Sequence, residues 1–76
     1  MDGRLVLLRY YIEYWRQNVA ESTLTHRLII ESYTHLAAYT YAYKNKPYPR
    51  AIVKIKRNPA QIRLTGKDMG KVSLDR

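Results

Sequence analysis

The fold prediction starts from residues 5–19, which read LVLLRYYIEYWRQNV. At roughly 100° per residue, an α-helix over this stretch gathers its large apolar side chains onto one stripe. That stripe consists of Leu5, Leu8, Ile12, Trp15 and Val19. Arg9 and Glu13 fall on the opposite face, where their i,i+4 spacing favours an ion pair. The pattern therefore predicts an amphipathic helix over residues 5–19.

A second helix is predicted over residues 24–44, where apolar and aromatic side chains again share one face. Ser22 or Thr23 can cap its first turn, because a hydroxyl oxygen accepts a hydrogen bond from the free N–H groups there. Pro47 and Pro49 prevent the helix from continuing. Because the link between the two helices is short, we expect them to form an antiparallel hairpin.

Beyond Pro49 the apolar period changes from 3.6 to 2, which is typical of strands. The alternating apolar residues are Val53 and Ile55, then Ile62 and Leu64, then Val72 and Leu74. Residues 58–61 and 66–70 carry the Asn, Pro and Gly of turns. The sequence thus predicts an α+β fold in a single domain of residues 1–76. A helical hairpin over 5–44 is followed by a two- or three-stranded antiparallel β-meander over 51–75.

The net charge of +8 lies entirely in residues 44–76, since four Arg and four carboxylates balance within residues 1–43. Such an excess favours a polyanionic partner, either nucleic acid or an acidic protein surface. In the predicted register, Lys54, Lys56 and Arg63 share the sheet face away from the apolar side. The full set of candidate nucleic-acid contacts is Arg50, Lys54, Lys56, Arg57, Arg63, Lys67 and Lys71. Aromatic residues that could stack on bases are missing from these strands, so no sequence specificity is visible. The choice between DNA and RNA also stays open.

Eight tyrosines and no phenylalanine make up an unusual aromatic set. Tyrosine has an apolar ring and a polar tip, so it suits both half-buried cores and protein interfaces. Tyr33, Tyr39 and Tyr43 are interpreted as core residues beneath the sheet. The candidate self-association residues are Tyr10, Tyr11, Tyr14, Ile30, Ala37 and Tyr41. They predict a homodimer formed through the helical half.

Catalysis is not expected, because no convergent set of titratable groups is visible. Glu31 and His35 are only two ligands, too few for a metal site, and without cysteine there is no disulfide or thiolate zinc site. We therefore expect no cofactor. The chain has no secretory signal and no apolar run long enough to span a membrane, which predicts a soluble cytoplasmic protein.

The leading hypothesis is a small basic nucleic-acid-binding protein that contacts phosphates through its sheet and self-associates through its helices. The alternative is a regulator or inhibitor that docks its basic face on an acidic protein surface. A third possibility makes residues 22–27 the start of a DNA-recognition helix. Association with a membrane surface is the fourth, although here the charge lies on strands rather than along an amphipathic helix.

Overall fold

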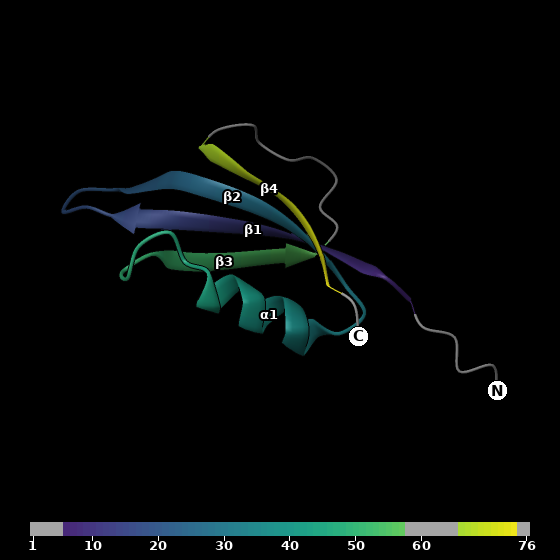
Figure 1. Cartoon of the computed structure of the whole chain (residues 1–76). Helices are drawn as coiled ribbons and strands as arrows, with labels where there is room; N and C mark the ends of the chain where they lie inside the picture. Colours follow the sequence, from purple (N-terminus) through teal and green to yellow (C-terminus); the bar gives the residue numbers. More distant parts are fainter. Residues whose placement is uncertain (1–5, 58–65, 75–76) are drawn as a thin grey trace.

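A computed structural model describes residues 6–57 and 66–74 and contains one mixed sheet with a single helix. In chain order the elements are β1 (Leu8–Gln17), β2 (Ser22–Ser32), α1 (His35–Lys44), β3 (Ile52–Arg57) and β4 (Lys67–Leu74). The strand order across the sheet is β3-β1-β2-β4. β1 is antiparallel to both of its neighbours, whereas β2 and β4 run parallel (Figure 1).

The predicted helical hairpin over residues 5–44 is wrong, because β1 and β2 form a hairpin of strands across this region. In β1, buried Tyr10, Ile12 and Tyr14 alternate with residues on the other face. This period of 2 is the one a half-buried strand requires. The apolar stripe of the predicted helix left out Tyr10, Tyr11 and Tyr14, although tyrosine favours strands.

The predicted helix over residues 24–44 keeps only its last ten residues, as α1. Before it, β-branched residues such as Thr25, Ile29 and Ile30 fit the extended backbone of β2. The helix is capped by Thr34, whose side chain accepts a hydrogen bond from the Ala37 N–H, rather than by Ser22 or Thr23. Because residues 22–27 lie in β2, they cannot begin a DNA-recognition helix.

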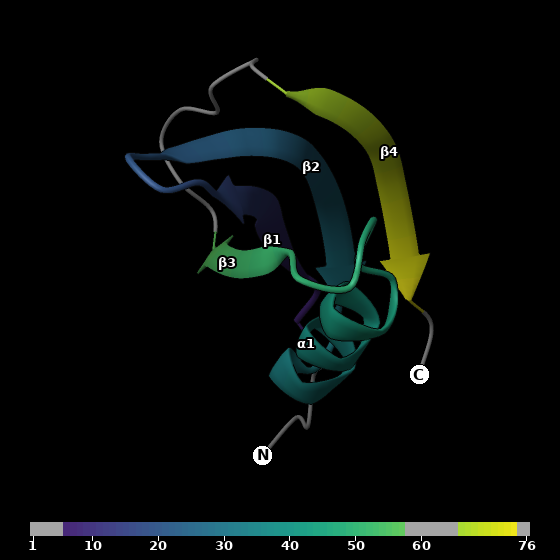
Figure 2. The same ribbon diagram turned by 90° about the vertical axis from the view of Figure 1, so that its left-hand side faces the viewer.

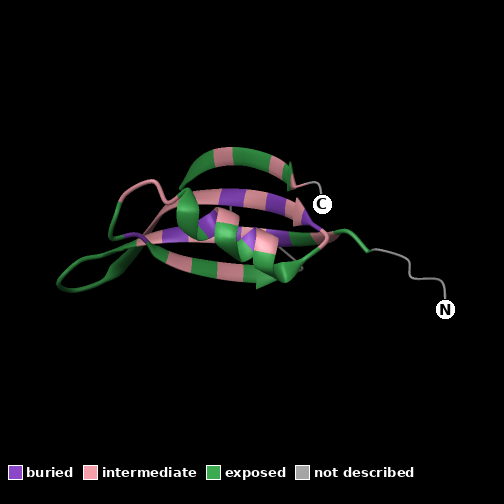
Figure 3. Ribbon diagram, turned by 60° about the horizontal axis from the view of Figure 1, so that its bottom comes forward, coloured by how far each residue is buried: buried purple, intermediate pink, exposed green. Residues whose placement is uncertain are grey.

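The core lies between α1 and one face of the sheet. Ala38 and Ala42 are fully buried, and their small side chains let the helix lie close to the sheet. Figure 3 shows α1 lying over the sheet, with buried segments on both. The Tyr14 hydroxyl donates a 2.7 Å hydrogen bond to the Ala42 carbonyl oxygen, and the Tyr10 hydroxyl contacts His35 Nδ1. β2 and β4 bend, so that the sheet curves around α1 (Figure 2).

The C-terminal half contains strands, but the described ones do not form the predicted meander. β3 pairs with β1 at one edge of the sheet, and β4 pairs with β2 at the other. Residues 67–70, predicted as part of a turn, belong to β4. The predicted turn at residues 58–61 and the strand and pairings of residues 62–64 lie outside the described residues. Among residues 6–57 and 66–74, no helix has the length and apolar character needed to cross a bilayer.

Candidate nucleic-acid interface

The face of the sheet opposite α1 is the candidate site. α1 is the only helix among the described residues and packs against the other face. We call this opposite face the open face. Its side chains come from alternate positions of all four strands, because residues paired across strands point to the same side. It consists of Arg9, Tyr11, Glu13, Trp15 and Gln17 on β1, Ser22, Leu24, Arg27, Ile29 and Glu31 on β2, Ile52, Lys54 and Lys56 on β3, and Asp68, Lys71 and Ser73 on β4.

Two aromatic side chains, Tyr11 and Trp15, lie along the central strand β1 of the open face. At about 3.4 Å per residue they are separated by about 14 Å. The Lys54 ammonium lies 4.3 Å from the centre of the Trp15 ring, and the indole Nε1–H donates a 3.1 Å hydrogen bond to Glu13 Oε1. Trp15 is thus held in place by Glu13 of the same strand and by Lys54 of β3.

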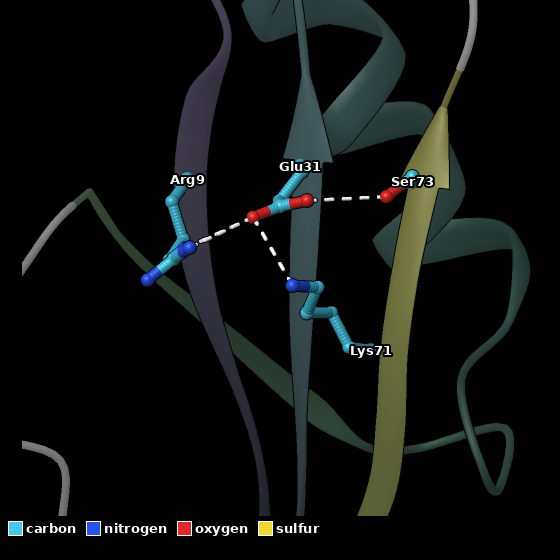
Figure 4. A network of polar contacts seen from close by, with 4 residues as sticks. All are labelled: Arg9, Glu31, Lys71 and Ser73. Atoms are coloured by element: carbon cyan, nitrogen blue, oxygen red, sulfur yellow. Dashed lines mark hydrogen bonds and ion pairs between the residues drawn. The ribbon is translucent and has the colours of Figure 1, made fainter.

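Glu31 is the centre of a polar network that joins three strands (Figure 4). Its Oε2 accepts a hydrogen bond from Arg9 Nη2 at 2.9 Å and lies 3.4 Å from Lys71 Nζ, while the Ser73 hydroxyl donates to Oε1 at 3.1 Å. The Arg9 hydrogen bond, together with those from Ser73 and Lys71, lowers the pKa of the Glu31 carboxyl. The same contact raises the pKa of the Arg9 guanidinium.

The open face carries five cations and three carboxylates, so it is only moderately positive. Lys56 Nζ lies 3.3 Å from Glu13 Oε2, and Arg27 Nη2 lies 3.6 Å from Asp68 Oδ2. The predicted basic sheet almost lacked acids, because Glu13 and Glu31 were placed on helices. Their position on β1 and β2 means that a polyanion must compete with carboxylates for most of these cations.

The predicted basic residues do not form one cluster. Lys54 and Lys56 share the open face on edge strand β3, whereas Lys71 lies on the opposite edge strand, about 14 Å away at 4.8 Å per strand. Arg57 lies opposite buried Tyr10, Lys67 lies opposite His26, and Arg50 is exposed before β3. Arg63 lies outside the described residues.

The predicted nucleic-acid contacts did not include the two cations Arg9 and Arg27 or the two aromatics Tyr11 and Trp15 of this face. Tyr11 had been predicted for self-association instead. Aromatic side chains are therefore present on this face of the sheet, but they come from the N-terminal half. A period of 2 in residues 8–17 was the signal that could have placed Tyr11 and Trp15 on the same face of one strand.

The candidate self-association residues do not lie together on one surface either. Tyr10, Tyr14 and Ile30 are buried in the core and have no surface to offer a partner. Burial raises the pKa of Tyr10, and it raises the pKa of Tyr14 to about 12. Tyr11 belongs to the open face, and only Ala37 and Tyr41 lie on α1, where both are half-buried.

A second cation–π pair lies on the α1 side of the sheet, where Arg16 Cζ is 4.6 Å from the centre of the Tyr48 ring. The Thr25 hydroxyl donates its single proton to the Tyr14 carbonyl oxygen at 3.1 Å. It therefore accepts hydrogen bonds from the Tyr48 hydroxyl and from His26 Nδ1. Thr25 is the extra residue of a β-bulge between β1 and β2. The bulge therefore anchors the Pro47–Pro49 segment, because Thr25 is hydrogen-bonded to the hydroxyl of Tyr48, which lies between the two prolines.

Comparison of the chain with protein-family models, curated proteins and solved structures found no match. Within the part of the chain that the structure describes, no three His, Cys, Asp or Glu side chains form a group that could hold a metal ion.

Proposed function

We propose that the protein binds single-stranded nucleic acid across the open face. Bases would stack on Tyr11 and Trp15, while Lys54, Lys56 and Arg27 would contact the phosphates. The observation that carries this proposal is the pair of aromatic side chains on the central strand, next to the basic edge strand β3. A base offers a π-face to such rings whatever its identity, so this mode of binding tolerates many sequences.

Single strands fit the open face better than duplexes do. An aromatic ring on a sheet reaches a base face only where the base is unpaired and unstacked, because a duplex encloses its bases. The moderate charge supports the same choice, since stacking contributes about 1–3 kcal/mol per base and does not depend on a large excess of cations. Of the five cations, Lys54 is the one held by a ring rather than by a carboxylate.

The experiment measures affinity for a short single strand and for a duplex of the same length over a range of salt concentrations. We expect tighter binding to the single strand, with a slope of log K against log salt near −0.7 per phosphate contact. Lys54→Gln should make this slope shallower by about 0.7, because it removes one such contact.

Lys44→Gln is the matched control, because Lys44 is an exposed lysine of α1 and lies away from the open face. It should leave the slope unchanged. Stronger binding to the duplex, or equal slopes for the two variants, would argue against the proposal. Absence of any binding to either nucleic acid would leave an acidic protein surface as the partner for β3.

A further inference from the structure

Glu13 lies between the two aromatic side chains of the open face. On β1 it is two residues from Tyr11 and two residues from Trp15, so all three side chains point to the same side of the sheet. At about 3.4 Å per residue, each ring is about 7 Å from Glu13 along the strand. A single strand that stacks on both rings therefore passes over this carboxylate.

Among the described residues, two contacts hold the Glu13 carboxylate in place. The Trp15 indole Nε1–H donates to Oε1 at 3.1 Å, and Lys56 Nζ donates to Oε2 at 3.3 Å. An ionised carboxylate has about four acceptor sites, so each oxygen keeps the capacity to accept another hydrogen bond. The Glu13 side chain is 13% exposed, and a base lying over it would complete its removal from water.

The other two carboxylates of the open face are placed differently. Glu31 lies on β2 and already has contacts from three side chains of β1 and β4. Asp68 lies on edge strand β4, which is separated from β1 by β2. Glu13 is therefore the carboxylate that a strand stacked on both rings meets.

The charges around Glu13 decide which part of a nucleotide lies over it. A phosphate is repelled by the carboxylate and attracted by Lys54 and Lys56 on the neighbouring strand β3. The sugar–phosphate backbone would therefore follow β3, and the bases would project over β1. The rise per nucleotide in a duplex is about 3.4 Å, and even if extension doubles it, adjacent bases span only about 7 Å of the roughly 14 Å between the rings. At least one further base consequently lies between the two stacked ones, over Glu13.

An ionised carboxylate accepts hydrogen bonds and cannot donate them, so it favours a base edge that carries N–H donors. On its Watson–Crick edge guanine offers N1–H beside the N2 amino group, and these two donors match the two carboxylate oxygens. Adenine and cytosine offer one amino group next to an unprotonated ring nitrogen. Thymine and uracil offer one N–H between two carbonyl oxygens, which the carboxylate repels. A base without matching donors would cover the charge of Glu13 without compensating it.

We propose that Glu13 selects guanine at the position between the two stacked bases. This inference rests on the function proposed for the open face, because it needs a single strand that lies across Tyr11 and Trp15. The two stacked positions accept any base, since every base has a π-face. At the position over Glu13, guanine should bind about tenfold more tightly than a purine without the second donor, which is within the range of bidentate base contacts.

The first test uses short thymidine strands that differ only in their central nucleotide, with Trp15 fluorescence reporting the affinity of the wild type. Hypoxanthine is the matched control for guanine, because it keeps the purine ring and N1–H and lacks the N2 amino group. We expect guanine to bind about tenfold more tightly than hypoxanthine, and thymine to bind most weakly. Equal affinities for guanine and hypoxanthine would overturn the selection by Glu13 and leave the function of the open face standing. Binding to none of the strands would overturn both.

Glu13→Gln assigns the preference to this side chain. The amide keeps an acceptor for the Trp15 Nε1–H, but it has one oxygen in place of two and no longer matches the two donors of guanine. We expect the variant to bind guanine and hypoxanthine equally, and to bind the thymine strand at least as tightly as the wild type does, because a negative charge is removed. Glu21→Gln makes the same change of charge in the turn between β1 and β2 and should keep the preference. A preference that Glu13→Gln leaves unchanged, or that both variants reduce equally, would contradict the proposal.

Discussion

Glu31 connects three of the four strands, because it lies on β2 and is contacted by Arg9 from β1 and by Lys71 and Ser73 from β4. These contacts favour the ionised carboxylate and lower its pKa in the folded protein. Glu31 was predicted to lie in the second helix, but it is a junction between strands, two of which, β1 and β4, are distant in sequence.

The first prediction concerns the acid stability of Glu31→Gln. The unfolded chain has an ordinary glutamate pKa of about 4.3, and the folded pKa lies below it. The stabilisation is therefore fully present above the unfolded pKa and is lost as the pH falls through the folded pKa. We expect the wild type to be more stable than the variant at pH 7 and to lose more free energy of unfolding on acidification.

Urea unfolding at a series of pH values between neutral and about 3 measures this difference. Glu21→Gln is the control, because Glu21 is exposed in the turn between β1 and β2. Wild-type and Glu31→Gln curves that run parallel over the whole pH range would show that the network contributes nothing.

At the scale of elements, α1 docks on the sheet through the Tyr14 hydroxyl. The last carbonyls of a helix have no partner within it, and the Ala42 carbonyl, in the final turn of α1, accepts a hydrogen bond from Tyr14 at 2.7 Å. Tyr14 is fully buried, and this burial raises its pKa to about 12. The bond therefore satisfies a carbonyl and a hydroxyl that are both removed from water.

The second prediction is that Tyr14→Phe lowers the free energy of unfolding by about 1–2 kcal/mol, because the Ala42 carbonyl is left without its partner. Tyr43→Phe makes the same chemical change at a residue that is more than half exposed, and it should have almost no effect. Urea unfolding compares the two variants. Equal stabilities would mean that water replaces the Tyr14 hydroxyl at no cost.

The sequence pattern correctly predicted strands at β3 and at the end of β4. The period of 2 in residues 52–57 and 72–74 predicted strands where strands occur. In residues 8–17 the same period was present, but tyrosines on both faces made a helical stripe equally easy to draw. Burial against α1 distinguishes Tyr10 from Tyr11, and that is a tertiary fact which no local pattern contains.

At the scale of the whole molecule, the charge distribution along the sequence predicted a neutral half for assembly and a basic half for binding. The sheet does not keep this division, since β1 and β2 lie between β3 and β4. The parallel pairing of β2 with β4 joins residues more than forty positions apart in sequence, beyond the reach of any turn signal. The candidate site therefore combines aromatics from the first half with lysines from the second.

Trp15 allows the central claim to be measured directly, because it is the only tryptophan in the chain and lies on the open face. Titration with a single strand too short to bridge two copies should change its fluorescence until the site is saturated. Tyr11→Ala should weaken this binding by about 1–3 kcal/mol, or roughly 5- to 150-fold, through the loss of one stacked base.

Tyr43→Ala removes an exposed tyrosine from α1, away from the open face, and should leave the affinity unchanged. The account predicts saturable Trp15 quenching that Tyr11→Ala weakens and Tyr43→Ala does not. Binding that leaves Trp15 emission unaltered, or that the two variants weaken equally, would contradict it.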